Sequence, residues 1–433
     1  MSYSLLRRSC FLFGLLSCTL TSAWSQSFED ALSGADQSEH AADQQPHLFG
    51  EWGGERTKLM DEGVKFGLMY SSDSLWNIRS AETERLAVFS RVRGTIDLDF
   101  SRLTHTPGLF FHVTAVWQGG GNLGMYLGTI TGPSGLASEN TFRLDSWWLE
   151  KRVLGERLIV RAGQFAAQDF YGAQLFGPSF IFEPLQYGFG NLFSTYESFD
   201  PPSTPAAEVR VIPASHFYIK SMVFAADRTP YSHNLTGFVP QFRGDPMLVS
   251  EIGFSPGRKA SAVRAQDNVE ARKGYAGLYR FGGAYNPGKF VSTSSNKPVS
   301  GNYLIYGMAS QALYRTRPDT DRGIDLTAGA DWTPPDRTRN NQDLTVGVRL
   351  NEPLPGRLHN TLGIAYVRSG INQAFPVSSV LMSTHAAEQA FEANVLLELP
   401  RGLVLQPVLQ YYVNCGGSSH DAVVLGFHTK IDF

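Results

Sequence analysis

Long runs in which apolar and polar residues alternate occupy most of the chain from about residue 64 onward. Because successive side chains of a β-strand point to opposite faces, this period of two predicts strands with one apolar face. The runs approach the roughly 9–11 residues that a tilted strand needs to cross a bilayer, whereas strands of soluble sheets average about 5–6. The clearest runs are 85–101, 108–118, 323–332, 343–351, 390–399, 403–413 and 422–433.

The last run ends in an aromatic residue. Counting back from Phe433, alternate positions are nearly all apolar, and Asp432, Lys430 and His428 lie between them. In water the uncovered apolar face of such a strand would invite aggregation, whereas lipid covers it and barrel closure removes the edge. A terminal aromatic on an alternating strand resembles the signal read by the outer-membrane assembly machinery, so Phe433 is the predicted assembly signal. An edge strand of a soluble sheet is the alternative.

Composition narrows the classes of protein. Charged residues are 18% of the 433 residues, below the roughly 25% usual in soluble domains, and aromatic residues are 12%. That balance argues against a disordered chain. The net charge of -3 supplies no basic excess for binding nucleic acid. After the N-terminal segment there is no run of about 20 apolar residues, which leaves a soluble β-rich protein or a transmembrane β-barrel.

Residues 1–25 have the layout of an export signal. Arg7 and Arg8 precede the apolar run 10–20, and Ala23 and Ser25 suit a cleavage site before residue 26. A buried helix, a lipoprotein cleavage box at 15–18 and twin-arginine export are weaker interpretations of the same residues.

After removal of the signal, residues 26–48 are polar and acidic, and we predict an acidic polar spacer that is flexible or forms a short helix. The remaining chain then has one cysteine, Cys415, and therefore no intramolecular disulfide.

The connections between the runs differ in length in a regular way. Short turns at 103–108, 211–216, 352–357 and 399–402 alternate with long loops at about 119–141, 166–205, 226–245 and 368–388. This asymmetry is typical of outer-membrane barrels. The prediction is an all-β fold: a transmembrane antiparallel barrel of about 16 strands, with short periplasmic turns and long external loops.

Motifs that suggest chemistry are weak. Residues 119–124 match G-x-G-x-x-G, but the Gly-rich and β-branched residues that follow favour a flexible external loop over the helix that a dinucleotide site needs. His385 and Glu388 have helical spacing without a third metal ligand nearby. We predict no enzyme, no metal and no cofactor, although sequence alone leaves open a Ser–His pair formed by folding.

A barrel of about 16 strands is wide enough to hold water, so its inner face should be polar. Wall residues of both charges offer donors and acceptors that match the hydroxyls of a nearly neutral solute. For each residue the alternative is ordinary wall polarity without selectivity. The predicted pore-lining residues are Arg91, Arg93, Asp97, Asp99, Arg143, Asp145, Trp147, Arg161, Arg349, Glu392 and Asn394.

The segment 170–202 is the most distinctive loop. It has ten Phe and Tyr, many glycines and few charges, which is unfavourable if it is left in water. We expect it to fold inward as a constriction loop whose rings face the apolar side of sugars; packing against the rim or a neighbouring subunit is the alternative. Trp117, Trp332 and Tyr411 are expected to face outward at the membrane interface.

Several segments resemble the OprB-type carbohydrate-selective porins. These are the Trp52-Gly53-Gly54 motif followed by Arg56, Leu59 and Gly63, then Trp148–Glu150 and Arg161–Gln164, and finally Gln406-Pro407 with Asn414. The chain departs from the family at Cys415, where a proline is expected. The resemblance extends over 49–433 and implies facilitated diffusion of carbohydrates in the outer membrane of a Gram-negative bacterium, with membrane lipid, small carbohydrates and the assembly machinery as partners.

Other functions remain open at this point. They are a general non-selective porin, an outer-membrane barrel with an enzymatic or adhesive role, and a secreted β-sandwich lectin. The sequence also leaves open whether the chain forms a homo-oligomer.

Overall fold

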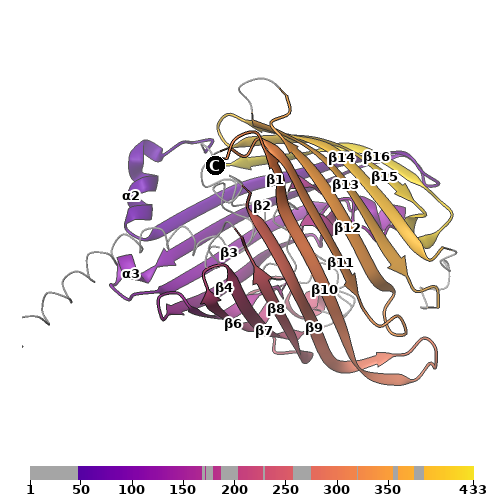
Figure 1. Cartoon of the computed structure of the whole chain (residues 1–433), viewed down its shortest axis with the longest axis horizontal. Coiled ribbons are helices and arrows are strands. Elements are labelled where there is room, and N and C mark those ends of the chain that lie inside the picture. Colours follow the sequence, from indigo (N-terminus) through magenta and orange to yellow (C-terminus); the bar gives the residue numbers. More distant parts are fainter. Residues whose placement is uncertain are drawn as a thin grey trace, which may run out of the picture.

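The chain folds into one closed barrel of sixteen antiparallel strands (Figure 1). Each strand pairs with its neighbours in the chain, and β1 pairs with β16 to close the barrel. The predicted fold class is therefore confirmed. This computed structural model describes residues 47–167, 171, 179–186, 203–227, 230–256, 275–318, 320–354, 359–374 and 385–433. The predicted signal, 1–25, and residues 26–46 of the predicted spacer lie outside these ranges.

The strands range from 8 residues in β5 to 18 in β10. Their bounds are β1 Val64–Arg79, β2 Arg85–Asp99, β3 Leu109–Gly120, β4 Thr141–Val153, β5 Leu158–Phe165, β6 Thr204–Ala214, β7 Phe217–Ala226, β8 Asp245–Phe254, β9 Gly277–Val291, β10 Pro298–Arg315, β11 Gly323–Trp332, β12 Asn340–Asn351, β13 His359–Ile371, β14 Ala387–Leu399, β15 Leu403–Val413 and β16 Ala422–Asp432. The described helices are short: η2 Trp52–Gly54, α2 Glu55–Asp61, α3 Phe100–Leu103, α4 Leu123–Leu127, α5 Glu183–Gln186, α7 Pro230–Asn234 and η6 Cys415–Gly417. None of these helices is long and apolar enough to cross a membrane.

Alternation along the strands separates a polar inner face from an apolar outer face. Large apolar side chains point away from the barrel, for example Phe281 at 59% exposure and Ile364 at 60%. The aromatic residues expected at the interface, Trp117, Trp332 and Tyr411, are exposed as well. In lipid these outer side chains lie in an apolar medium, and the closed sheet pairs the strand main chain.

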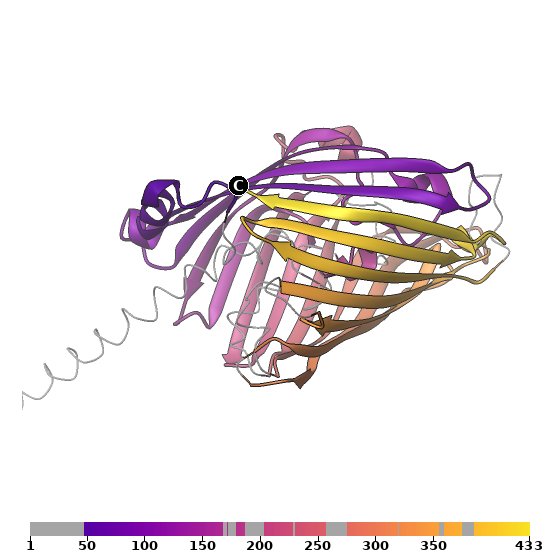
Figure 2. The same ribbon diagram turned by 90° about the horizontal axis from the view of Figure 1, so that it is seen from above.

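The two ends of the barrel differ. The end that carries Phe433, here called the turn end, also carries α2 and α3 (Figures 1 and 2). The opposite end, here called the loop end, carries the long connections 121–140, 166–203, 227–244 and 372–386, as the sequence predicts. The connection 255–276 is the exception, because it is long and belongs to the turn end.

A β-bulge in β4 changes which side chains face inward. Thr114 of β3 pairs with Ser146 and Ala115 pairs with Leu144, so Asp145 is an extra residue in the ladder. Beyond the bulge, the alternate positions Trp148, Glu150 and Arg152 are buried. The expectation that Trp147 shares the inner face with Arg143 and Asp145 is therefore wrong, and Trp148 faces inward in its place. One extra residue reverses the faces of the rest of a strand.

The wall has a second irregularity where β5 is short. β4 pairs with β5 only from Trp147 onward, so residues 141–146 extend beyond their partner strand. The β7–β8 connection covers this edge: the amide of Leu144 donates to the carbonyl of Thr236 at 2.9 Å. Gly237, with φ +71°, approaches so closely that a Cβ there would overlap the main-chain oxygen of Leu144.

Candidate functional site

Residues 179–185 of the β5–β6 connection lie inside the barrel against β12, β14 and β15. The carbonyl oxygen of Ser179 accepts hydrogen bonds from Asn394 Nδ2 at 3.1 Å and Gln406 Nε2 at 2.7 Å. Its hydroxyl oxygen lies 2.5 Å from Arg349 Nη1. Side chains of three wall strands therefore fix the main chain at Ser179.

The next residue, Phe180, is fully buried against two glycines of the wall. A Cβ on Gly347 or on Gly363 would lie 2.8 Å from the Phe180 ring. These glycines belong to the adjacent strands β12 and β13, so the wall is thinned at the place where the ring packs.

Glu392 of β14 binds the following main-chain amides. Its two carboxylate oxygens accept from Ile181 N and Phe182 N, each at 3.1 Å. Asn394 Nδ2 and Gln410 Nε2 donate to the same carboxylate at 2.7 Å and 3.2 Å. A buried carboxylate with four donors is well satisfied, and it holds the segment to the wall.

A second inward segment, residues 129–136, belongs to the β3–β4 connection. Glu388 accepts from Thr131 N at 2.6 Å, and Gln410 Nε2 donates to the carbonyl of Pro133 at 2.8 Å. The Ser134 hydroxyl donates to the Asp73 carboxylate. The expectation of a flexible external loop here is wrong, because polar wall side chains bind this main chain inside the barrel.

The two inward segments also bind each other. Gly135 N donates to the carbonyl of Ile181 at 2.9 Å, and Glu183 N donates to the carbonyl of Gly132 at 3.2 Å. They therefore form one unit attached to the wall of β12–β15, β1 and β2.

The β5–β6 connection contacts a different part of the wall at Tyr171. Its ring centroid lies 4.3 Å from Lys220 Nζ, and Met222 and Met247 belong to the same buried apolar cluster. These wall residues lie on β7 and β8, far around the barrel from β12, β14 and β15. The described part of 170–202, namely Tyr171 and 179–186, thus contacts well-separated parts of the wall.

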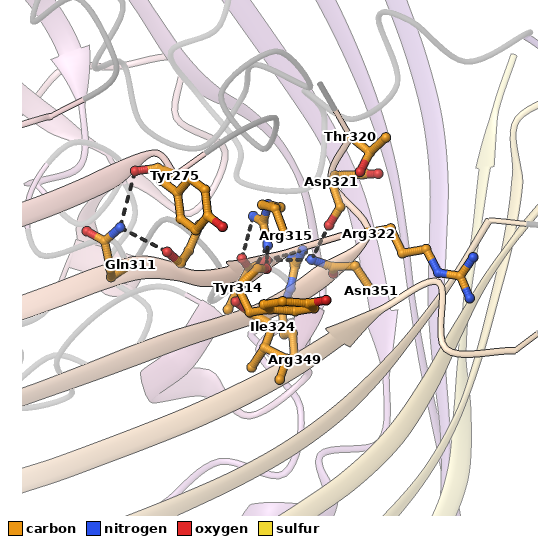
Figure 3. A network of polar contacts seen from close by, with 12 residues as sticks. Tyr275, Gln311, Tyr314, Arg315, Thr320, Asp321, Arg322, Ile324, Arg349 and Asn351 are labelled. Carbon is orange, nitrogen blue, oxygen red and sulfur yellow. Dashed lines mark hydrogen bonds and ion pairs between the residues drawn. The ribbon is translucent and has the colours of Figure 1, made fainter. Parts of the chain in front are cut away.

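Four carboxylates on the inner wall, carried by β4, β8 and β11, are each approached by two basic groups, and all are buried. This set is named the charge belt. The groups are Asp145 with Arg143 (2.6 Å) and Arg93 (3.5 Å), Glu150 with Arg161 (2.7 Å) and Arg152 (2.9 Å), Glu251 with Lys220 (3.1 Å) and Arg280 (3.8 Å), and Asp325 with Arg315 (2.5 Å) and Arg349 (3.2 Å). Figure 3 shows the two basic residues of the last group, Arg315 and Arg349, which lie close together beside Asn351. Within the belt, cations outnumber carboxylates.

Arg91 links the belt to the second inward segment. Its Nη2 donates to the carbonyl of Leu136 at 3.2 Å. Arg93 and Arg143 both approach Asp145. Three guanidinium groups thus lie on the inner face of β2 and β4 beside one carboxylate, and they present fixed N–H donors.

Two of the predicted pore-lining residues have contacts that are local to the wall. Asp97 is hydrogen-bonded to His112, whose ring stacks on Trp148 with centroids 3.8 Å apart. Asp99 caps α3 at the turn end, where its Oδ1 accepts from Ser101 N at 2.8 Å. Neither contacts the inward segments in the hydrogen bonds described for it.

The remaining predicted residues, except Trp147, are buried on the inner face. Arg349, Glu392 and Asn394 meet at the first inward segment, and Arg91 meets the second. The participation of these residues in solute passage stays a prediction. Sequence reasoning missed Gln410 and did not place Glu388 or Gln406 on the inner wall. It also missed seven residues of the charge belt, namely Glu150, Arg152, Lys220, Glu251, Arg280, Arg315 and Asp325. The alternation of the strands could have placed these residues on the inner face. Most of their hydrogen-bond partners could not be predicted, because they lie far away in the sequence.

The polar side chains at the first inward segment are engaged in hydrogen bonds with its main chain. Within the described ranges, no group of three or more His, Cys, Asp or Glu is placed to hold a metal ion. Glu388 binds three main-chain amides, of Ile130, Thr131 and Gly416, so its carboxylate is engaged in holding loops.

Comparisons with known proteins agree with this architecture. A model of the family described as carbohydrate-selective porin, OprB family, matches residues 83–433. The high-pH structure of Pseudomonas putida OprB is 18% identical, with a TM-score of 0.79 over 90% of this chain and 99% of that chain. Its low-pH structure is also 18% identical, with a TM-score of 0.57 over 89% and 98%. Salmonella typhi OmpF in complex with daunomycin is 10% identical, with a TM-score of 0.51 over 86% and 99%.

No curated protein matches the chain. At these identities, the likeness to solved structures shows the fold alone.

Proposed function

The chain belongs to the OprB family of carbohydrate-selective porins, and we propose that small sugars diffuse through its barrel past the two inward segments, beside the arginines of β2 and β4. As a porin of this family it lies in the outer membrane and carries carbohydrates passively, in contact with lipid. The observation that carries the residue-level proposal is the attachment of residues 179–185 to the inner wall through Arg349, Glu392 and Asn394.

The inward segments supply the size limit. Their main chain is bound by side chains from β1, β2, β12, β14 and β15, so they do not rely on apolar contact alone. Because the segments are already held in place, little conformational entropy is lost when a solute binds beside them. The inner wall beside them is so tightly filled that Arg93, Arg143 and Asp145 are each at most 8% exposed. A narrow passage of this kind favours small solutes.

The charge belt supplies the chemical preference. Its arginine and lysine groups donate hydrogen bonds, its carboxylates accept them, and sugar hydroxyls do both. Because the belt contains carboxylates as well as basic groups, the wall does not form a ring of one sign that would select ions. A sugar can exchange hydrogen bonds with water for hydrogen bonds with the wall as it passes.

The test is liposome swelling with purified protein shown to be inserted, comparing glucose, larger oligosaccharides and charged solutes of similar size. We expect glucose to enter faster than a charged solute of matched size, and oligosaccharides to be slowed. Entry ordered by size alone would leave a general porin. Absence of swelling would overturn the open-channel proposal and favour a barrel with an enzymatic or adhesive role.

Three further points belong to this proposal. Export depends on residues 1–25 in a Gram-negative cell, Phe433 is read by the assembly machinery, and passage involves no covalent step. The alternating last strand supports the second point, since β16 ends at the turn end beside β1.

A further inference from the structure

The segment before β1 contains a motif that passage of a solute does not use. Trp52, Gly53 and Gly54 have φ values of 49°, 72° and 98°, all in the left-handed region. Glycine tolerates this region because it lacks a Cβ, so the two glycines permit the turn. The turn starts α2 and brings the guanidinium of Arg56 to 4.6 Å from the centroid of the Trp52 ring. The motif therefore builds a pair in which Trp52 orients Arg56.

This pair lies against the last residue of the chain. Arg56 Nη2 donates to the main-chain oxygen of Phe433 at 2.5 Å. The ring centroids of Phe49 and Phe433 are 5.6 Å apart, and Leu48 N donates to the carbonyl of Asp432 at 2.8 Å. Phe433 is thus held by a guanidinium on its main chain and by an aromatic ring on its side chain.

The same segment is attached at its other end to the β2–β3 turn. Arg102 Nη1 donates to the carbonyl of Met60 at 3.0 Å, and Asp99 N donates to the carbonyl of Gly63 at 2.8 Å. Residues 48–63, here called the strap, therefore run from the end of β16, past the start of β1, to the turn that follows β2 (Figure 1).

The strap crosses the seam at which the barrel is closed. β1 and β16 are the first and last strands, and their pairing, from Met69–Asp432 onward, converts an open sheet into a barrel. Phe433 N donates to the carbonyl of Leu68 at 2.9 Å, so the last rung of this ladder lies beside the strap. Fraying here would expose two strand edges, which is unfavourable in lipid and in water.

We propose that the strap is a seam lock, in which a site formed by Phe49, Trp52 and Arg56 binds Phe433 of the same chain and prevents β16 from separating from β1. The charge-assisted hydrogen bond and the ring contact act on the final residue of the strand, where strand separation begins. The lock acts on the closure of the barrel and is independent of solute choice.

The test is hydrogen exchange followed by mass spectrometry on the full chain in phosphatidylcholine vesicles. In Arg56→Ala, we expect main-chain amides of β16 and β1 near Phe433 to exchange about tenfold faster, the effect of losing roughly one hydrogen bond. Amides of β7 and β8 should be unchanged, and so should the rate of glucose entry. Lys58→Ala is the matched control, because Lys58 is an exposed cation on the same helix, paired with Glu55 at 3.5 Å.

Two results would overturn the seam lock. One is wild-type exchange at β1 and β16 in Arg56→Ala. The other is an equal increase at β7 and β8, which would indicate general destabilisation. If Arg56→Ala does not assemble, Phe49→Leu keeps an apolar side chain and removes the ring contact. It should give the same local increase, smaller in size, and an unchanged pattern would count equally against the proposal.

Discussion

Glu388 and Glu392 lie four residues apart on the inner face of β14, and their carboxylates bind main-chain amides of two different inward segments. Glu388 accepts from Ile130 and Thr131 of the β3–β4 connection. Glu392 accepts from Ile181 and Phe182 of the β5–β6 connection. One strand therefore positions both segments, and we expect the width of the passage to depend on these two side chains.

Glu392→Ala should release residues 179–185 from the wall. Two amides lose their acceptor, which removes roughly 1.5–3 kcal/mol for each hydrogen bond to a charged group. We expect oligosaccharides to enter liposomes several-fold faster while barrel yield stays near wild type. Glu84→Ala, an exposed carboxylate beside the loop end, is the control. Unchanged oligosaccharide entry would show that Glu392 does not set the size limit.

Gly363→Ala should also displace the first inward segment. The new methyl group would lie 2.8 Å from both the Phe180 ring and Asn394 Oδ1. We expect faster entry of large solutes and a loss of about 1–3 kcal/mol in the free energy of unfolding, the usual effect of overpacking. Gly94→Ala is a matched control, because nothing lies within 4 Å of a Cβ there. Swelling assays and urea titration would measure the two effects, and equal behaviour of both variants would contradict the packing argument.

Replacing Arg91 and Arg93 by alanine should change sugar flux more than barrel assembly. Arg93 belongs to the charge belt at Asp145, and Arg91 holds the carbonyl of Leu136. The barrel ladder itself does not involve these side chains, so heat-modifiable gel mobility should remain. Normal flux together with lost assembly would refute the prediction.

The thiol of Cys415 should react slowly in the folded protein. Burial raises its pKa to about 12, whereas the pKa of an exposed thiol is roughly 8.5. The neutral thiol therefore favours the folded state below the unfolded pKa, and this contribution is lost as the pH rises from about 8.5 toward 12. Iodoacetamide at pH 8 should label Cys415 far more slowly than an exposed cysteine introduced by Ser419→Cys, as read by mass spectrometry on the chain without residues 1–25. Equal labelling rates would contradict the burial of the thiol.

The strands were predictable because the alternation of apolar and polar residues within each strand shows which side chains face lipid and which face the lumen. Lipid-facing and lumen-facing positions alternate within a single run such as 403–413, so no distant contact is needed to recognise it. The long connections were recognisable for the same reason, as gaps between runs.

The wrong predictions concern features that depend on contacts with other parts of the chain, which the sequence of a single strand does not reveal. The face of Trp147 depends on the pairing of Thr114 and Ala115 with β4, a register that only the partner strand reveals. The inward course of residues 129–136 depends on Glu388, which lies 258 positions from Ile130 in the chain. A glycine-rich loop can extend into external solvent or fold into the lumen. Here polar side chains of the wall bind its main chain and hold it inside the barrel.

The β7–β8 connection completes the barrel wall in addition to linking two strands. Thr236 supplies the acceptor that β5 is too short to supply, and Gly237 lies against the main chain of β4. Most loops tolerate insertions and deletions, but we do not expect this loop to, because its main chain must pair with the edge of β4. Insertions should therefore be tolerated in the tip at 80–84 and rejected near Thr236. The short β5 is therefore compatible with a closed wall only while this loop stays in place.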